Sequence, residues 1–125
     1  MPIVDVEIVC ASESELRSVS ASALANAAGA VLGSAAGHTW VRLRYLSSEC
    51  YAENQSALSP AELPVFVTVL HTLLPSEPAL SAQVKKLTQA VSGVVVRPYD
   101  RVHVQFAPEA AGRQAFGGRL VRAGS

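Results

Sequence analysis

The second residue of this 125-residue chain is a proline that stands directly before an alternating apolar and polar segment, "IVDVEIV". Proline has no backbone N–H, so at the start of a strand it fits the first residue or an edge position. A chemical explanation is also open. If Met1 is removed, Pro2 becomes the amino terminus and its ring nitrogen becomes a secondary amine, a group that no other residue type supplies.

Two pairs of polar side chains lie two positions apart in segments that alternate like strands. Arg42 and Arg44 share one face of "WVRLRYL", and His103 and Gln105 share one face of "VHVQF". A guanidinium can bond both oxygens of a carboxylate, so the two arginines are candidates to bind an acidic substrate. The alternative for both pairs is a solvated polar face of a sheet.

The elements that would position these residues follow from hydrophobic periodicity. Val4, Val6 and Ile8 alternate with acidic residues, which predicts a strand. Apolar residues then recur at helical spacing from a Ser12–Glu15 capping box to Gly33, and the "HTWVRLRYL" segment predicts a second strand. A strand, a helix and a strand in this order form a βαβ unit with parallel strands.

The same pattern then returns after a polar loop. "PVFVTVLH" begins at Pro64, 62 positions after Pro2, and is followed by a helix predicted from an N-cap at Ser76, with Pro78 in its first turn, to Gly93, and by the strand Val102–Phe106. We therefore expect one α+β domain over residues 1–125, made of pseudo-repeats 1–60 and 61–125. Its four-stranded sheet would carry two helices on one face. The uncovered face predicts a closed symmetric assembly.

Composition excludes several classes of function. Ten basic and ten acidic residues cancel, which argues against a nucleic-acid partner. Residues 23–36 are too interrupted for a membrane span, and the acidic start is unlike a signal peptide, so we expect a cytoplasmic protein with Cys10 and Cys50 as reduced thiols. The three histidines lack metal-ligand spacing (His38, His71 and His103). "GRQAFGG" is too short for a nucleotide loop, so no cofactor is expected.

Pro2 before a strand, the doubled βαβ pattern, "PYDRVHVQF" and "AFGGRL" (Ala115–Leu120) together cover nearly the whole chain. In these features the sequence resembles the tautomerase superfamily, which includes 4-oxalocrotonate tautomerase and macrophage migration inhibitory factor. The resemblance implies a cofactor-independent keto–enol tautomerase for a small enol or 2-keto carboxylic acid. It also implies a homotrimer with sites at subunit boundaries.

The resemblance also implies roles for single residues. Pro2 would be the catalytic base and acid, because an α-amino group titrates near neutral pH and an apolar site lowers its pKa further. Arg42 and Arg44 would bind a carboxylate. His103 and Gln105 would reach a neighbour's site, where His103 would donate a hydrogen bond to an enolate oxygen. Phe116 would wall the pocket.

Several other positions bear on the activity that the resemblance implies. Pro64 matches Pro2 in the repeat, but its nitrogen is an amide without basicity, and Trp40 shares the arginine face and would pack there or in an interface. Positions where relatives carry arginines, a lysine or a glutamate hold other residues here (Ala11, Ser12, Ser34, Thr72, Pro75 and Ala115). Two alternatives therefore stay open. One is a non-catalytic trimeric binding protein, and the other is a hydratase or decarboxylase that uses the same proline.

Overall fold

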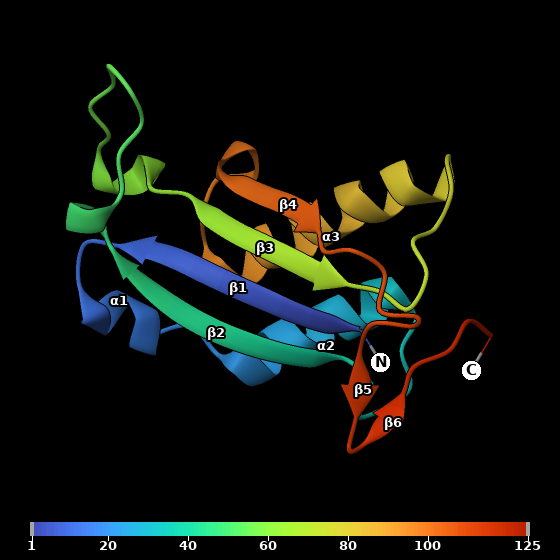
Figure 1. The fold of residues 1–125 in the computed structure, drawn as a ribbon. Helices are drawn as coiled ribbons and strands as arrows, with labels where there is room; N and C mark the ends of the chain where they lie inside the picture. The colour runs from blue at the N-terminus through green and yellow to red at the C-terminus, as the bar shows by residue number, and fades with distance from the viewer. Residues whose placement is uncertain (1, 125) are drawn as a thin grey trace.

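The structure is a computed structural model, and it describes residues 2–124 apart from the side chain of Leu16. Met1, whose removal would free the amine of Pro2, lies outside the described residues. Four strands form the main sheet in the order β2-β1-β3-β4 (Figure 1). They are β1 (Ile3–Cys10), β2 (Trp40–Ser47), β3 (Val65–Leu70) and β4 (Val102–Phe106).

Each half of the chain contributes one parallel pair of strands to this sheet. β1 runs parallel to β2 and β3 runs parallel to β4, while β1 and β3 pair antiparallel at the centre. The long helices α2 (Ala21–Leu32) and α3 (Ala79–Val95) lie together behind one face of the sheet, and the opposite face stays open (Figure 1). The predicted fold class is therefore confirmed.

The core lies between the sheet and the two long helices. Every second residue of β1 and β3 points into it, as period-two alternation requires, and Leu24 and Leu87 fill it from α2 and α3. The strand residues at its centre are almost fully buried (Val4, Val6, Ile8, Val65, Val67 and Val69). Because these side chains fix which face of each strand is inside, the open face receives the intervening polar residues.

The first predicted helix is wrong in its extent. The structure splits it into α1 (Glu13–Arg17) and α2, and the hydroxyl of Ser20 caps α2 by accepting the backbone N–H of Ala23 at 3.0 Å. The predicted capping box is absent, because the Glu15 carboxylate accepts the N–H of Ala11 instead, at 3.1 Å. The end of α2 at Gly33, which has a φ of 66°, is as predicted.

The second predicted helix differs at both ends. Pro78 rather than Ser76 is the N-cap of α3, and the helix continues through Gly93 to end at Val96, which has a φ of 56°. Val95 is 7% exposed and belongs to the core. Burial of this last turn therefore outweighs the preference of glycine for a helix end.

Two smaller features complete the fold. The connection between the halves contains two short 3₁₀ helices (Ser48–Cys50 and Pro60–Glu62) and projects beyond one end of the sheet (Figure 1). The tail forms a separate hairpin of β5 (Ala115–Phe116) and β6 (Arg119–Leu120). Among the described residues, no helix has the length and apolarity that crossing a bilayer demands.

Candidate functional site

Pro2 stands at the start of β1, where the first two strands begin side by side. Its carbonyl oxygen accepts the backbone N–H of Trp40, the first residue of β2, at 3.0 Å. Pro2 is half-buried, whereas Pro64 is fully buried at the start of β3. The residue that matches Pro2 in the repeat is thus closed off from solvent.

An aromatic pair lies beside this end of β1. The indole of Trp40 donates its Nε1–H to the carbonyl of Gly37 at 2.9 Å, which fixes the orientation of the ring. Phe116 packs edge-to-face against it with ring centroids 5.1 Å apart and an angle of 88°. These residues and His38 line a largely apolar hollow of about 190 Å³. The structure therefore brings Phe116 and Trp40 to the end of the sheet where Pro2 lies.

The tail reaches this position because the β5–β6 hairpin folds back on the body of the protein. Gly117 and Gly118 both have positive φ at its turn, which glycine adopts without strain. Backbone hydrogen bonds tie Val121 to Gly112 and Gln114 at 2.8 Å each. In Figure 1 the hairpin lies by the end of the sheet where β1 and β2 begin.

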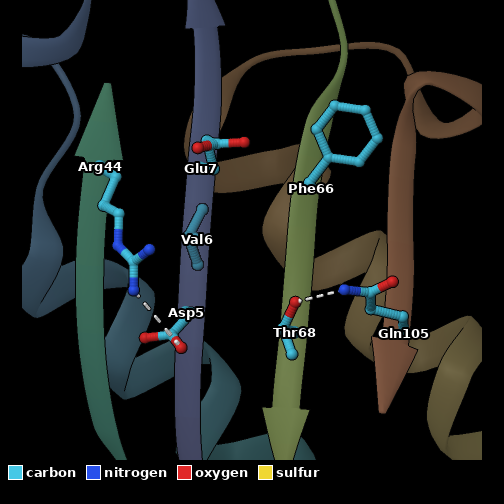
Figure 2. A pocket seen from close by; sticks show the side chains of 7 residues that line it. All are labelled: Asp5, Val6, Glu7, Arg44, Phe66, Thr68 and Gln105. Carbon is cyan, nitrogen blue, oxygen red and sulfur yellow. Dashed lines mark hydrogen bonds and ion pairs between the residues drawn. The ribbon is translucent and has the colours of Figure 1, made fainter. Parts of the chain in front are cut away.

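The two candidate arginines lie on the open face of the sheet, and both contact a carboxylate of the chain itself. The parallel register pairs Asp5 with Arg42. The Nε and Nη2 atoms of Arg42 donate to the two oxygens of Asp5 at 2.5 and 2.8 Å. These hydrogen bonds, and the charge behind them, raise the pKa of Arg42 above its usual value. Arg44 Nη2 lies 3.8 Å from Asp5 Oδ2 (Figure 2).

Gln105 lies across the open face from the arginines, on β4. Its amide donates to the hydroxyl of Thr68 at 2.9 Å, and Thr68 stands opposite Asp5 in the register of β1 and β3. A hollow of about 350 Å³ opens between these rows, as Figure 2 shows. Its walls come from all four strands (Asp5, Val6, Glu7, Arg44, Phe66, Thr68 and Gln105).

His103 is separated from Pro2 within one chain. It is the second residue of β4 and lies against Phe66 with ring centroids 5.7 Å apart, and the rings of Phe66 and Tyr51 have centroids 5.8 Å apart. The β1–β3 register places Phe66 opposite Glu7, four residue pairs along the sheet from the Ile3–Leu70 pair next to Pro2. A single subunit therefore does not bring His103 to its own proline.

A polar cluster that sequence reasoning missed adjoins His103. Tyr51 donates its hydroxyl to Glu53 at 2.6 Å, and Arg101 Nη2 donates to the same carboxylate at 2.5 Å. These two hydrogen bonds lower the pKa of Glu53, while burial, followed by the hydrogen bond to Glu53, raises the pKa of Tyr51. Arg101 lies 48 positions from Glu53 in the sequence, so no local spacing could have revealed the cluster.

Cys10 is not arranged as a reactive group. Cys10 and Cys50 are free thiols, and Cys10 is fully buried. Burial raises the pKa of Cys10 despite Arg97 Nη2 at 3.9 Å, which keeps the sulfur protonated and unreactive. Within residues 2–124, no three His, Cys, Asp or Glu side chains gather in a way that would hold a metal ion.

Three features identify the fold: the strand order, the parallel pair of strands within each half, and the two helices on one face of the sheet. The chain has the tautomerase fold. A structure described as an F6 fused 4-OT wild-type asymmetric trimer matches with a TM-score of 0.70 at 17% identity, over 97% of each chain. The macrophage migration inhibitory factor from Oncomelania hupensis matches with a TM-score of 0.70 at 20% identity, over 97% of this chain and 82% of the other.

A malonate semialdehyde decarboxylase also matches this tautomerase fold. Its TM-score is 0.63 at 19% identity, over 92% of this chain and 90% of the other. No family model matches the sequence, and no curated protein does. The likeness therefore lies in the fold, and activity has to be argued from the residues of this chain.

Sequence reasoning overlooked two residues at the candidate site. Asp5 was noted only as a polar residue of an alternating strand, although aligning the first two predicted strands in parallel would have placed it beside Arg42. His38 was considered only as a metal ligand, and nothing in its local spacing indicates the hollow that it lines.

Proposed function

We propose that this chain is a cofactor-independent keto–enol tautomerase for a small enol or 2-keto carboxylic acid, with Pro2 as general base and acid once Met1 is removed. The observation that carries the proposal is the position of Pro2. It stands directly before β1 of a tautomerase fold and beside Trp40, whose ring packs against Phe116 at a largely apolar hollow. An apolar wall disfavours the charged form of an amine, so more of it is available as a base.

The reaction needs one proton to move between two atoms of the substrate. The secondary amine of Pro2 takes the proton from the enol hydroxyl, and the resulting ammonium returns it to the neighbouring carbon to give the keto form. Atoms and charge balance without a metal or an organic cofactor. The hollow beside Trp40 would keep water away from the ammonium while the proton is in transit.

Binding of the substrate carboxylate is assigned to Arg42, with Arg44 two residues further along the same strand face. Both are exposed on the open face of the sheet. We propose that the protein is a homotrimer in which His103 and Gln105 of one subunit approach the site of a neighbour. The separation of His103 from Pro2 within one chain supports this arrangement, as does the trimer named for the fused 4-OT structure.

The first experiment is an intact-mass measurement on untagged protein, followed by turnover of phenylenolpyruvate and 2-hydroxymuconate. Material without Met1 should isomerise at least one of the two enols, and Pro2→Ala should remove most of that activity without changing the oligomer. Equal turnover by Pro2→Ala and the unmodified protein would refute the proposed role of Pro2.

Two observations favour other functions. The Arg42 fork is already filled by Asp5, and Ala11 and Ser12 stand where relatives carry an arginine, which favours a non-catalytic trimeric binding protein. The match to malonate semialdehyde decarboxylase favours a hydratase or decarboxylase of an unsaturated or semialdehyde acid. Assaying the same samples for hydration and for carbon dioxide release separates these alternatives from tautomerisation.

A further inference from the structure

The open face of the sheet carries a carboxylate that competes for the same guanidinium as a substrate would. Asp5 accepts two hydrogen bonds from Arg42, at 2.5 and 2.8 Å, in the bidentate geometry with which arginine binds carboxylate ligands. Its Oδ2 also lies 3.8 Å from Arg44. The side chain of Asp5 therefore already occupies the position that a substrate carboxylate would take at Arg42.

The charges on this part of the face also cancel. Asp5 and Glu7 on β1 stand opposite Arg42 and Arg44 on β2 in the parallel register. Two carboxylates facing two guanidiniums leave no net positive field to attract an anionic ligand. A ligand carboxylate can form an ion pair with Arg42 only when the Asp5 carboxylate has moved away from the guanidinium.

We infer that Asp5 is an internal competitor for the carboxylate site, so that an acidic substrate binds Arg42 only by displacing the Asp5 side chain. This inference rests on the proposed function, because it takes Arg42 as the carboxylate site. Asp5 thereby lowers the affinity of the site for every carboxylate that binds the Arg42 guanidinium. It takes no part in proton transfer.

The exposure of the pair makes displacement possible. The Arg42 side chain is 62% exposed and that of Asp5 is 26% exposed. Ion pairs in contact with water stabilise a fold little, because water solvates both partners when they separate. Asp5 is also held at the backbone of β1, so it can turn away while Arg42 keeps its place on β2.

Succinate is a suitable probe, because it is a small dicarboxylate with no enol or keto group for Pro2 to act on. Trp40 is the one tryptophan of the sequence and lies two residues before Arg42 on the same face, so its fluorescence reports on binding. The titration compares the unmodified protein, Asp5→Asn and Glu7→Gln at constant ionic strength. Glu7 is the matched control: it lies on the same face of the same strand, and among the described residues it makes no ion pair or hydrogen bond.

We expect Asp5→Asn to bind succinate roughly tenfold more tightly, since a charge-assisted hydrogen-bond pair is released to the ligand. Glu7→Gln should change the affinity by no more than about twofold, since the loss of its carboxylate releases no guanidinium. Adding Arg42→Ala to Asp5→Asn should abolish the gain. Asp5→Ser is titrated alongside, so a folding defect in one variant, seen by circular dichroism, leaves the comparison intact.

Two outcomes would overturn the inference. In the first, Asp5→Asn and Asp5→Ser bind succinate no more tightly than Glu7→Gln does. In the second, the gain in affinity persists when Arg42 is also replaced by alanine. The turnover of Pro2→Ala is measured on the same substrates. If Asp5→Asn binds succinate no more tightly while turnover still depends on Pro2, only the proposed role of Asp5 is refuted. If Asp5→Asn does bind succinate more tightly but turnover is independent of Pro2, the proposed catalysis is refuted and the proposed role of Asp5 is supported.

Discussion

The two βαβ halves have the same plan but carry different chemistry. In the first half, β1 and β2 present Asp5, Arg42 and Arg44 on the open face, and Pro2 stands half-buried at the start. In the second half, β3 and β4 present Thr68 and Gln105 at the same level of the sheet, joined by a neutral hydrogen bond.

The difference lies on the open face and at the ends of elements, while the buried faces of the two halves are alike. Leu24 of α2 and Leu87 of α3 both fill the shared core, and both central strands bury every second residue. Packing restricts the buried positions to apolar residues of suitable size in either half. The exposed positions carry no such restriction, so they could take on ionic groups in one half and neutral groups in the other.

The largest expected effect separates the two prolines that begin the halves. Pro2→Ala should lower enol turnover by roughly 10²- to 10⁴-fold, the usual contribution of a general acid or base. Pro64→Ala should retain turnover and lose about 1 kcal/mol of stability, because its ring restricts the unfolded chain. Steady-state kinetics and urea unfolding measure the two effects. A similar loss of turnover in both variants would break the functional contrast between the halves.

The next effect concerns the core that the halves share. Leu24→Ala and Leu87→Ala should each cost about 2–5 kcal/mol in the free energy of unfolding, because each leaves a cavity among buried residues. Both variants should still unfold in a single transition, since the helices pack on one continuous core. Urea titrations followed by circular dichroism test this. A second transition in Leu24→Ala alone would show that the halves unfold independently.

The helix ends predict effects of opposite sign in the two halves. Gly33 ends α2 at a φ of 66°, and Val96 ends α3 at a φ of 56° although it is 84% exposed. Gly33→Ala should lose about 1 kcal/mol of stability and Val96→Gly should gain about 1 kcal/mol, because any residue with a Cβ is strained in the left-handed region and glycine is not. Thermal unfolding compares them. Equal signs for the two changes would contradict this assignment of strain.

The smallest effect tests the contact between the connecting loop and the second half. Tyr51 and Arg101 lower the pKa of Glu53, so the ionised carboxylate contributes stability above its usual titration range. That contribution is lost as the pH falls through the lowered pKa. Glu53→Gln should therefore lower the melting temperature by a few degrees at neutral pH, with the gap closing in acid. A difference in melting temperature that is unchanged at low pH would show that the charge of Glu53 is not the cause.

Much of the fold could be predicted because its signals are local. Alternating valines placed β1 and β3, and helical spacing placed the long helices on one face. The left-handed end of α2 at Gly33 could also be predicted from the sequence. The end of α3 was not, because Val95 is drawn into a core that distant strands build, and that burial overrides the local signal at Gly93.

The candidate site, too, could be predicted from the sequence only in part. Residue order and periodicity were enough to predict that Pro2 precedes a strand, that two arginines share a strand face, and that the pattern occurs twice. The contacts of Asp5 with the Arg42 guanidinium and of Phe116 with Trp40 could be seen in the folded chain alone. These contacts join residues 37 and 76 positions apart, and strand register and tail path, which bring them together, are set by packing of the whole chain.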